Sequence, residues 1–84
     1  MSELESLKKK IIYRANYRGT KEMDLLLSKF VDKYLNRLSK NELIDLFDFL
    51  NLEDDVIYDY YFNKKNNIQI KDGSVKTLLS KFKL

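Results

Sequence analysis

The sequence predicts an all-α fold, a compact five-helix bundle that forms a single small domain over residues 1–84. Three observations lead to this prediction: apolar residues recur at spacings of three and four, proline is absent, and an S-x-x-E capping pattern occurs twice. With 84 residues and a hydrophobic fraction of 44%, the chain can build one core. A domain of this size is expected to be stable by only about 5 kcal/mol.

The first two helices have the most regular patterns. Residues 3–17 are predicted to form a helix that opens with a capping box of Ser2 and Glu5. A longer helix over residues 21–38, with Thr20 as its N-cap, has the strongest periodicity and should provide most of the core. The predicted buried stripes are Leu4, Leu7, Ile11 and Ala15 in the first helix, and Met23, Leu26, Leu27, Phe30, Val31, Tyr34 and Leu38 in the second.

Two shorter helices follow. A second capping box, Ser39 with Glu42, is predicted to start a helix that ends near Leu50. Asp54 is the predicted N-cap of a fourth helix that continues to Phe62. The residues expected to face the core are Leu43, Leu46, Phe47 and Leu50 in the third helix, and Ile57, Tyr60 and Tyr61 in the fourth.

The last part of the chain begins with a polar loop at residues 63–67. Residues 68–70 have the pattern of a short extended segment, and Asp72-Gly73 predicts a turn. Ser74 is the predicted cap of a final short helix. No apolar run approaches the ~20 residues that cross a bilayer, so no membrane insertion is expected. The predicted buried face of the last helix consists of Val75, Leu78, Leu79 and Phe82.

The charged residues are distributed unevenly along the chain. The net charge is +3, but residues 8–21 include six basic and no acidic side chains, while residues 42–59 include seven acidic and no basic ones. This predicts a basic end and an acidic end, which would orient a protein partner, although solvated helix faces have the same composition. A basic-patch nucleic-acid binder is a weaker alternative, because the acidic helices would be repelled by phosphate; no nucleic-acid partner is predicted.

The residue types argue against an enzyme. The chain has no histidine and no cysteine, so it lacks the commonest general base, the commonest metal ligand and a thiolate nucleophile. The carboxylate pairs Asp45 with Asp48 and Asp54 with Asp55 suggest solubility more than acid–base catalysis. We therefore predict neither a catalytic residue nor a metal site, and the absence of cysteine fits a reducing compartment.

The junction between the first two predicted helices is the candidate partner-binding site. Gly19 is expected to end the first helix with a positive φ, and Arg14 and Arg18 are expected to share one helix face. Glu22 and Asp24 fall in the first turn of the next helix. Arg18 and Glu22 lie outside the apolar stripes, so both should be exposed and present opposite charges across the turn. The alternative interpretation is a capped helix–helix turn without a partner.

These residues also carry a resemblance to a known family. The pattern Arg18-Gly19-x-x-Glu22, followed by Asp24, resembles the RGxxE signature of the small SdhE-type FAD assembly factors, also called succinate dehydrogenase assembly factors. The resemblance is clearest over residues 8–62.

Upstream, residues 11–14 match an apolar pair, an aromatic and an arginine of the family. Downstream, residues 52–60 are similar to its LxDW segment, with Glu53 where proline is common and Tyr60 where tryptophan is common.

The resemblance implies an assembly factor that binds the flavoprotein subunit of succinate dehydrogenase, with fumarate reductase as a further client. The family promotes covalent attachment of FAD to a histidine of that client, so FAD would belong to the client and no cofactor would be bound by this chain. Some members are identified instead as antitoxins of a membrane-associated toxin, and this remains an alternative. The implied partner-binding residues are Arg14, Tyr17, Arg18, Gly19, Glu22 and Asp24.

The expected state is a monomer in a bacterial cytoplasm. Glu3 and Glu5 oppose a transit-peptide interpretation of the N-terminus. If the source is eukaryotic, the resemblance places the protein in the mitochondrial matrix.

Overall fold

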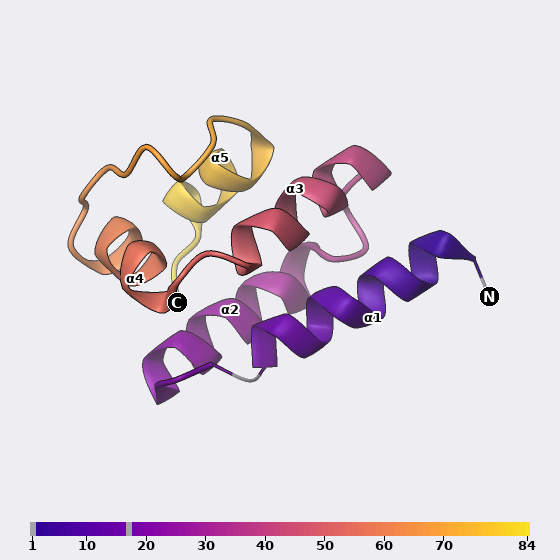
Figure 1. The fold of residues 1–84 in the computed structure, drawn as a ribbon, viewed down its shortest axis with the longest axis horizontal. Helices are drawn as coiled ribbons and strands as arrows, with labels where there is room; N and C mark the ends of the chain where they lie inside the picture. The colour runs from indigo at the N-terminus through magenta and orange to yellow at the C-terminus, as the bar shows by residue number, and fades with distance from the viewer. Residues whose placement is uncertain (1, 17) are drawn as a thin grey trace.

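The computed structural model describes residues 2–16 and 18–84, and five helices follow one another along this part of the chain (Figure 1). The described residues contain no strand, so the predicted all-α, five-helix fold is confirmed. Within them, no helix is long and apolar enough to cross a membrane. The helices are α1 (Glu3–Asn16), α2 (Lys21–Tyr34), α3 (Lys40–Leu50), α4 (Asp54–Phe62) and α5 (Ser74–Lys81).

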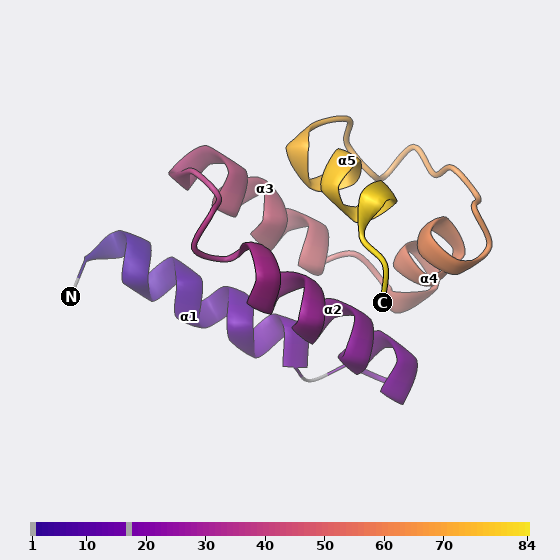
Figure 2. The ribbon, with the colours of Figure 1, turned by 180° about the vertical axis from the view of Figure 1, so that it is seen from behind.

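The first three helices form the body of the molecule. α1 packs against both α2 and α3, and α3 packs in turn against α5. Figures 1 and 2 show α1, α2 and α3 running back and forth along the long axis, with α4 and α5 beyond α3. Because α1 contacts α3, the basic and acidic runs lie partly on neighbouring helices and not at opposite ends, which corrects the predicted charge separation.

The core lies between the helices, and α2 supplies its centre. The ring of Phe30 is fully buried and lies 5.0 Å from the ring of Tyr34 and 5.4 Å from that of Phe82, measured between centroids. Phe82 follows α5, so the end of the chain returns to α2 and closes the core. The largest fully buried side chains confirm most of the predicted stripes: Phe30, Ile11, Met23, Leu26, Leu27, Leu43, Leu46, Leu50, Ile57 and Leu79.

The predicted caps of the first three helices are present. Glu5 donates its backbone N–H to Ser2 Oγ at 3.2 Å. Ser39 and Glu42 form the full reciprocal box at α3, with distances of 2.9 and 3.3 Å. The backbone bond from Ser39, assisted by the hydroxyl of Ser74, lowers the pKa of Glu42 below its ordinary value of 4.5.

Two helix predictions differ from the structure. α2 ends at Tyr34 and not at residue 38, because Arg37 donates to the Tyr34 carbonyl at 2.9 Å in a tighter turn that breaks the α-helical pattern. In α3, Phe49 is buried whereas Phe47 is half-buried. α3 packs between α1 and α5, so its buried face is wider than one stripe.

The segment before α5 also differs. The N-cap position is Gly73 at φ 154°, and no side chain caps the helix, so the predicted cap at Ser74 is wrong. Residues 68–70 form a turn and are not extended, because Ile70 donates its N–H to the Asn67 carbonyl at 3.0 Å. Ile70 is thereby buried, while Ile68 is fully exposed.

Candidate functional site

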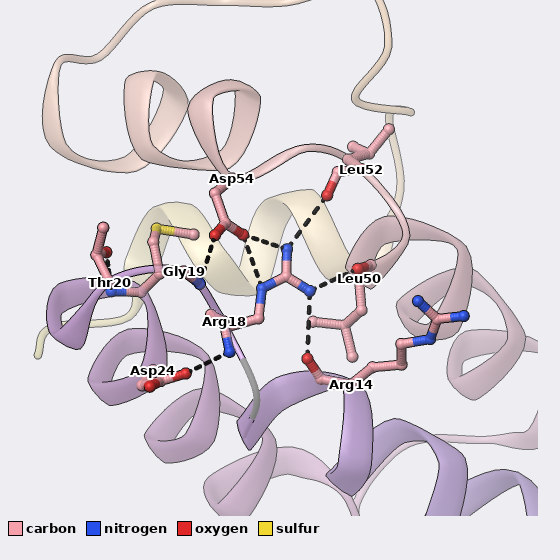
Figure 3. A network of polar contacts seen from close by, with 9 residues as sticks. Arg14, Arg18, Gly19, Thr20, Asp24, Leu50, Leu52 and Asp54 are labelled. Carbon is pink, nitrogen blue, oxygen red and sulfur yellow. Dashed lines mark hydrogen bonds and ion pairs between the residues drawn. The ribbon is translucent and has the colours of Figure 1, made fainter.

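The junction between α1 and α2 is organised around the side chain of Arg18, which is only 8% exposed (Figure 3). Arg18 Nε and Nη2 lie 2.8 and 2.6 Å from Asp54 Oδ1. Nη1 donates to the carbonyls of Arg14 and Leu50 at 3.2 and 2.8 Å, and Nη2 also donates to the Leu52 carbonyl at 3.2 Å. All five N–H donors of the guanidinium therefore have partners.

These contacts join the ends of three helices. Leu50 ends α3 and Arg14 lies in the last turn of α1, where carbonyls lack partners within the helix. A cation is favourable at both positions, and the Asp54 carboxylate is favourable at the start of α4. The predicted exposure of Arg18 is wrong because the residue follows α1 and does not extend its outer face, so the turn directs the side chain toward α3 and α4.

Asp54 has a role that was not predicted from the sequence. The N-cap position of α4 is Glu53, which makes no side-chain cap bond, so the predicted N-cap role of Asp54 is wrong. Asp54 Oδ1 instead holds Arg18, and Oδ2 accepts from the backbone N–H of Gly19 at 3.0 Å. No local pattern in the sequence connects residues that lie 35 and 36 positions apart.

Gly19 is explained by the approach of this carboxylate. Among the described residues, positive φ occurs at Lys64 and Gly73, so the positive φ predicted for Gly19 is wrong. A Cβ atom on Gly19 would lie 3.2 Å from Asp54 Oδ2, which is tighter than ordinary van der Waals contact. Since Arg18 holds the carboxylate in place, a side chain at this position would have to displace part of the ion pair.

A second carboxylate fixes the turn from the α2 side. Asp24 Oδ1 accepts the backbone N–H of Arg18 at 2.6 Å, a short charge-assisted bond. Thr20 caps α2 as predicted, with its hydroxyl oxygen accepting from the backbone N–H of Met23 at 3.3 Å. Residues 18–20, called the α1–α2 turn below, are therefore held by two carboxylates and lead into a capped helix.

The remaining predicted site residues that the structure describes, Glu22 and Arg14, do not take part in the Arg18 side-chain network through their own side chains. Glu22 is exposed, as predicted, and makes no hydrogen bond or ion pair with another described residue. Arg14 is exposed, and its guanidinium extends away from Arg18 in Figure 3, so the two arginines contribute to different surfaces. Tyr17 lies outside the described residues, and its role stays a prediction.

The arrangement combines a fixed turn with a carboxylate that is available to a partner. The Asp54 carboxylate neutralises Arg18, so the predicted presentation of opposite charges by Arg18 and Glu22 does not hold. An exposed Glu22 can accept a hydrogen bond or an ion pair from outside. In the part of the chain that the structure describes, no group of three or more His, Cys, Asp or Glu side chains is arranged to hold a metal ion.

Comparison with known proteins gives consistent matches over most of the chain. Residues 9–83 match the family described as flavinator of succinate dehydrogenase. Succinate dehydrogenase assembly factor 2 of Scheffersomyces stipitis, a mitochondrial protein, is 44% identical over 64 residues, which cover 75% of this chain and 41% of that protein. The FAD assembly factor SdhE of Acetobacter pasteurianus is 31% identical over 61 residues, which cover 73% of this chain and 56% of that protein.

The relatives are longer than this chain. The matched region covers 45% of succinate dehydrogenase assembly factor 2 of Dictyostelium discoideum and 24% of that of Penicillium rubens, which are 34% and 38% identical to the chain. No solved structure matches the chain. Since the family match extends over residues 9–83 and includes the whole Arg18 network, the chain belongs to the flavinator of succinate dehydrogenase family.

Proposed function

We propose that the chain is an assembly factor that binds the flavoprotein subunit of succinate dehydrogenase and promotes covalent attachment of FAD to it. The observation that carries the proposal is the match of residues 9–83 to the family. In this function the chain is a binding module without catalytic activity, and FAD belongs to the client flavoprotein. It acts where that flavoprotein matures, which is the bacterial cytoplasm or the mitochondrial matrix, and the flavoprotein of fumarate reductase is a further candidate client.

The geometry of the α1–α2 turn supports docking through Glu22. Its carboxylate is exposed at the second position of α2, directly after a turn whose backbone is fixed by Asp24 and Asp54. A turn that is already ordered loses little conformational entropy when a partner binds. Glu22 is therefore suited to receive a cationic side chain or an N–H group of the client.

The other predicted binding residues are given more specific roles. Arg14 offers an exposed cation in the last turn of α1. Gly19 is exposed, so the client can approach its backbone, whereas its missing side chain leaves room for the Asp54 carboxylate. Arg18 and Asp24 act indirectly, because their contacts hold the backbone on which Glu22 is presented.

Co-expression with the flavoprotein subunit tests the proposal. The host should lack its own assembly factor, and covalent flavin is scored by fluorescence of the flavoprotein band on a denaturing gel. Wild-type protein is expected to increase this fluorescence strongly over a control without the chain. Asp45→Ala, which removes an exposed carboxylate on α3, should behave as wild type. An unchanged flavin signal in the presence of folded wild-type protein would contradict the proposal.

A further inference from the structure

A groove lies on the surface between α1 and α2, close to the α1–α2 turn, with a volume of about 340 Å³. Its floor is apolar: Ala15, Val31 and Leu35 are almost completely buried, and Ile12 forms a wall that remains 42% exposed. All lining residues come from α1, from α2 and from the two residues after α2. No other described segment of the chain therefore contributes to the groove.

The groove continues from the surface that presents Glu22. Asn16, the last residue of α1, and Ser28 on α2 both line it. Leu25 lies three residues after Glu22 and three before Ser28, so the three residues share one face of the helix. Leu25 is 45% exposed, although it is a large apolar residue. A partner bound at Glu22 would thus meet an exposed leucine and then the groove.

The length and the charges of the groove suggest what it binds. From Ser28 to Asn36 the lining extends ~12 Å along the helix direction, enough for about two helical turns of a partner. Lys29 lines the groove, and Lys8, which donates to Asn36 Oδ1 at 3.1 Å, lies one turn before Ile12. The lining includes one carboxylate, Asp32.

We propose that this groove binds a short amphipathic segment of the client flavoprotein, which inserts apolar side chains against Ala15 and Val31 and directs acidic side chains to the flanking lysines. The inference rests on the proposed function and adds a second contact to it, separate from Glu22. Continuity with the Glu22 surface favours this occupant over a second copy of the chain, and the lysines favour a segment that carries acidic side chains.

Two isoleucines provide a matched test. Ile12 and Ile44 are both 42% exposed, but Ile44 lies on α3 and does not line the groove. Affinity for the purified flavoprotein subunit is measured by titration calorimetry with wild type, Ile12→Glu, Ile44→Glu and Glu22→Ala. Ile12→Glu is expected to weaken binding at least about tenfold, as loss of a central apolar contact does. Ile44→Glu should bind within about twofold of wild type.

A charge variant gives an independent measurement if Ile12→Glu fails to fold. Lys29 is exposed, so Lys29→Glu should fold normally and weaken binding about fivefold or more at low salt, with a smaller effect at high salt. Lys65→Glu, in the loop after α4, is the control and should leave the affinity unchanged.

The outcomes separate this inference from the proposed function. If wild type binds, Glu22→Ala weakens binding, and both Ile12→Glu and Lys29→Glu bind as wild type, the groove proposal is wrong and the proposed function stands. If wild type does not bind the flavoprotein, both are wrong. If sedimentation shows a wild-type dimer that Ile12→Glu dissociates, the occupant is a second copy of the chain and the proposal is overturned.

Discussion

Arg18 and Glu22 belong to one short signature, yet their environments are opposite. The Arg18 side chain is 8% exposed, and all its donors are bound to Asp54 and to three backbone carbonyls. Glu22, four residues later, is exposed and has no polar contact with the described residues. The difference indicates that the two residues of the signature have different roles. Arg18 fixes the α1–α2 turn, and Glu22 is exposed next to it.

The boundary between turn and helix causes this difference. Arg18 lies in the α1–α2 turn, from which its side chain reaches the end of α3 and the start of α4. Glu22 lies at the second position of α2, where side chains that do not belong to the apolar stripe face solvent. Substitution of Arg18 should therefore lower the stability of the fold, whereas substitution of Glu22 should weaken binding of a partner.

Removing Arg18 should have the largest effect on stability. Arg18→Ala leaves Asp54 without its cation and leaves the carbonyls of Leu50 and Leu52 without a donor. We expect a loss of about 3 kcal/mol in the free energy of unfolding, near the lower end for a broken buried pair because Asp54 is 30% exposed. For a domain of this size the melting temperature should fall by about 15 °C.

Urea unfolding followed by circular dichroism measures this loss. Arg37→Ala is the control, since Arg37 is exposed and should change stability by less than about 0.5 kcal/mol. A melting temperature of Arg18→Ala close to that of wild type would show that the network does not stabilise the fold.

Gly19 tests whether the Asp54 carboxylate is what excludes a side chain. Gly19→Ala should cost about 1–2 kcal/mol, because its Cβ would press on Asp54 Oδ2 at 3.2 Å. In an Asp54→Ala background the same change should cost much less, since the oxygen is gone. Thermal unfolding of the four proteins gives this coupling. An equal cost in both backgrounds means that another contact requires the glycine.

Asp24 is a carboxylate in the first turn of α2 that is bound within the chain, and its contribution to stability can be measured against an unbound carboxylate of the same helix. Asp24→Ala removes the acceptor of the Arg18 N–H and should cost about 1 kcal/mol. Asp32→Ala changes an exposed carboxylate farther along α2 and should stay within about 0.5 kcal/mol of wild type. If the two variants unfold at the same urea concentration, the Asp24 bond contributes nothing measurable.

Glu42 is a first-turn carboxylate that is bound within the chain, unlike Glu22. Its pKa is lowered by the backbone N–H of Ser39 and then by Ser74, so folding favours its charged form. This contribution is present above the ordinary pKa of 4.5 and is lost as the pH falls through the lowered value.

The expected effect is small and appears in the pH dependence of melting. Glutamine at this position keeps the cap but does not titrate, so Glu42→Gln should lose less stability than wild type between about pH 5 and about pH 3. Identical pH profiles for the two proteins would show that the capping bond does not contribute to the acid sensitivity of the fold.

The helices could be predicted from the sequence because their signals are local. Apolar spacing and the Ser39–Glu42 box identify α3 within residues 39–50, and the α2 stripe correctly places Phe30 at the centre of the core. The end of α2 was missed because the stripe continues to Leu38 after the helical hydrogen bonds have ended.

The inner structure of the candidate site could not be predicted in this way. Arg18 and Gly19 are adjacent in the sequence, but the contact that explains both is with the Asp54 carboxylate, 36 and 35 positions away. Local rules assign Asp54 to an N-cap and Gly19 to a positive φ, and tertiary contacts override both assignments. The exposure of Glu22 was predictable because it depends on the α2 pattern alone.

The most direct test measures stability and function on the same preparation of Glu22→Ala. We expect a free energy of unfolding within about 0.5 kcal/mol of wild type. We also expect a strong loss of covalent flavin in the co-expressed flavoprotein, because the proposed contact with the client is the exposed Glu22 carboxylate. A stable Glu22→Ala protein that supports full flavinylation would contradict the docking role. If Glu22→Ala is unfolded, Glu22 is needed for the fold, which would contradict its assignment to binding and that of Arg18 to stability.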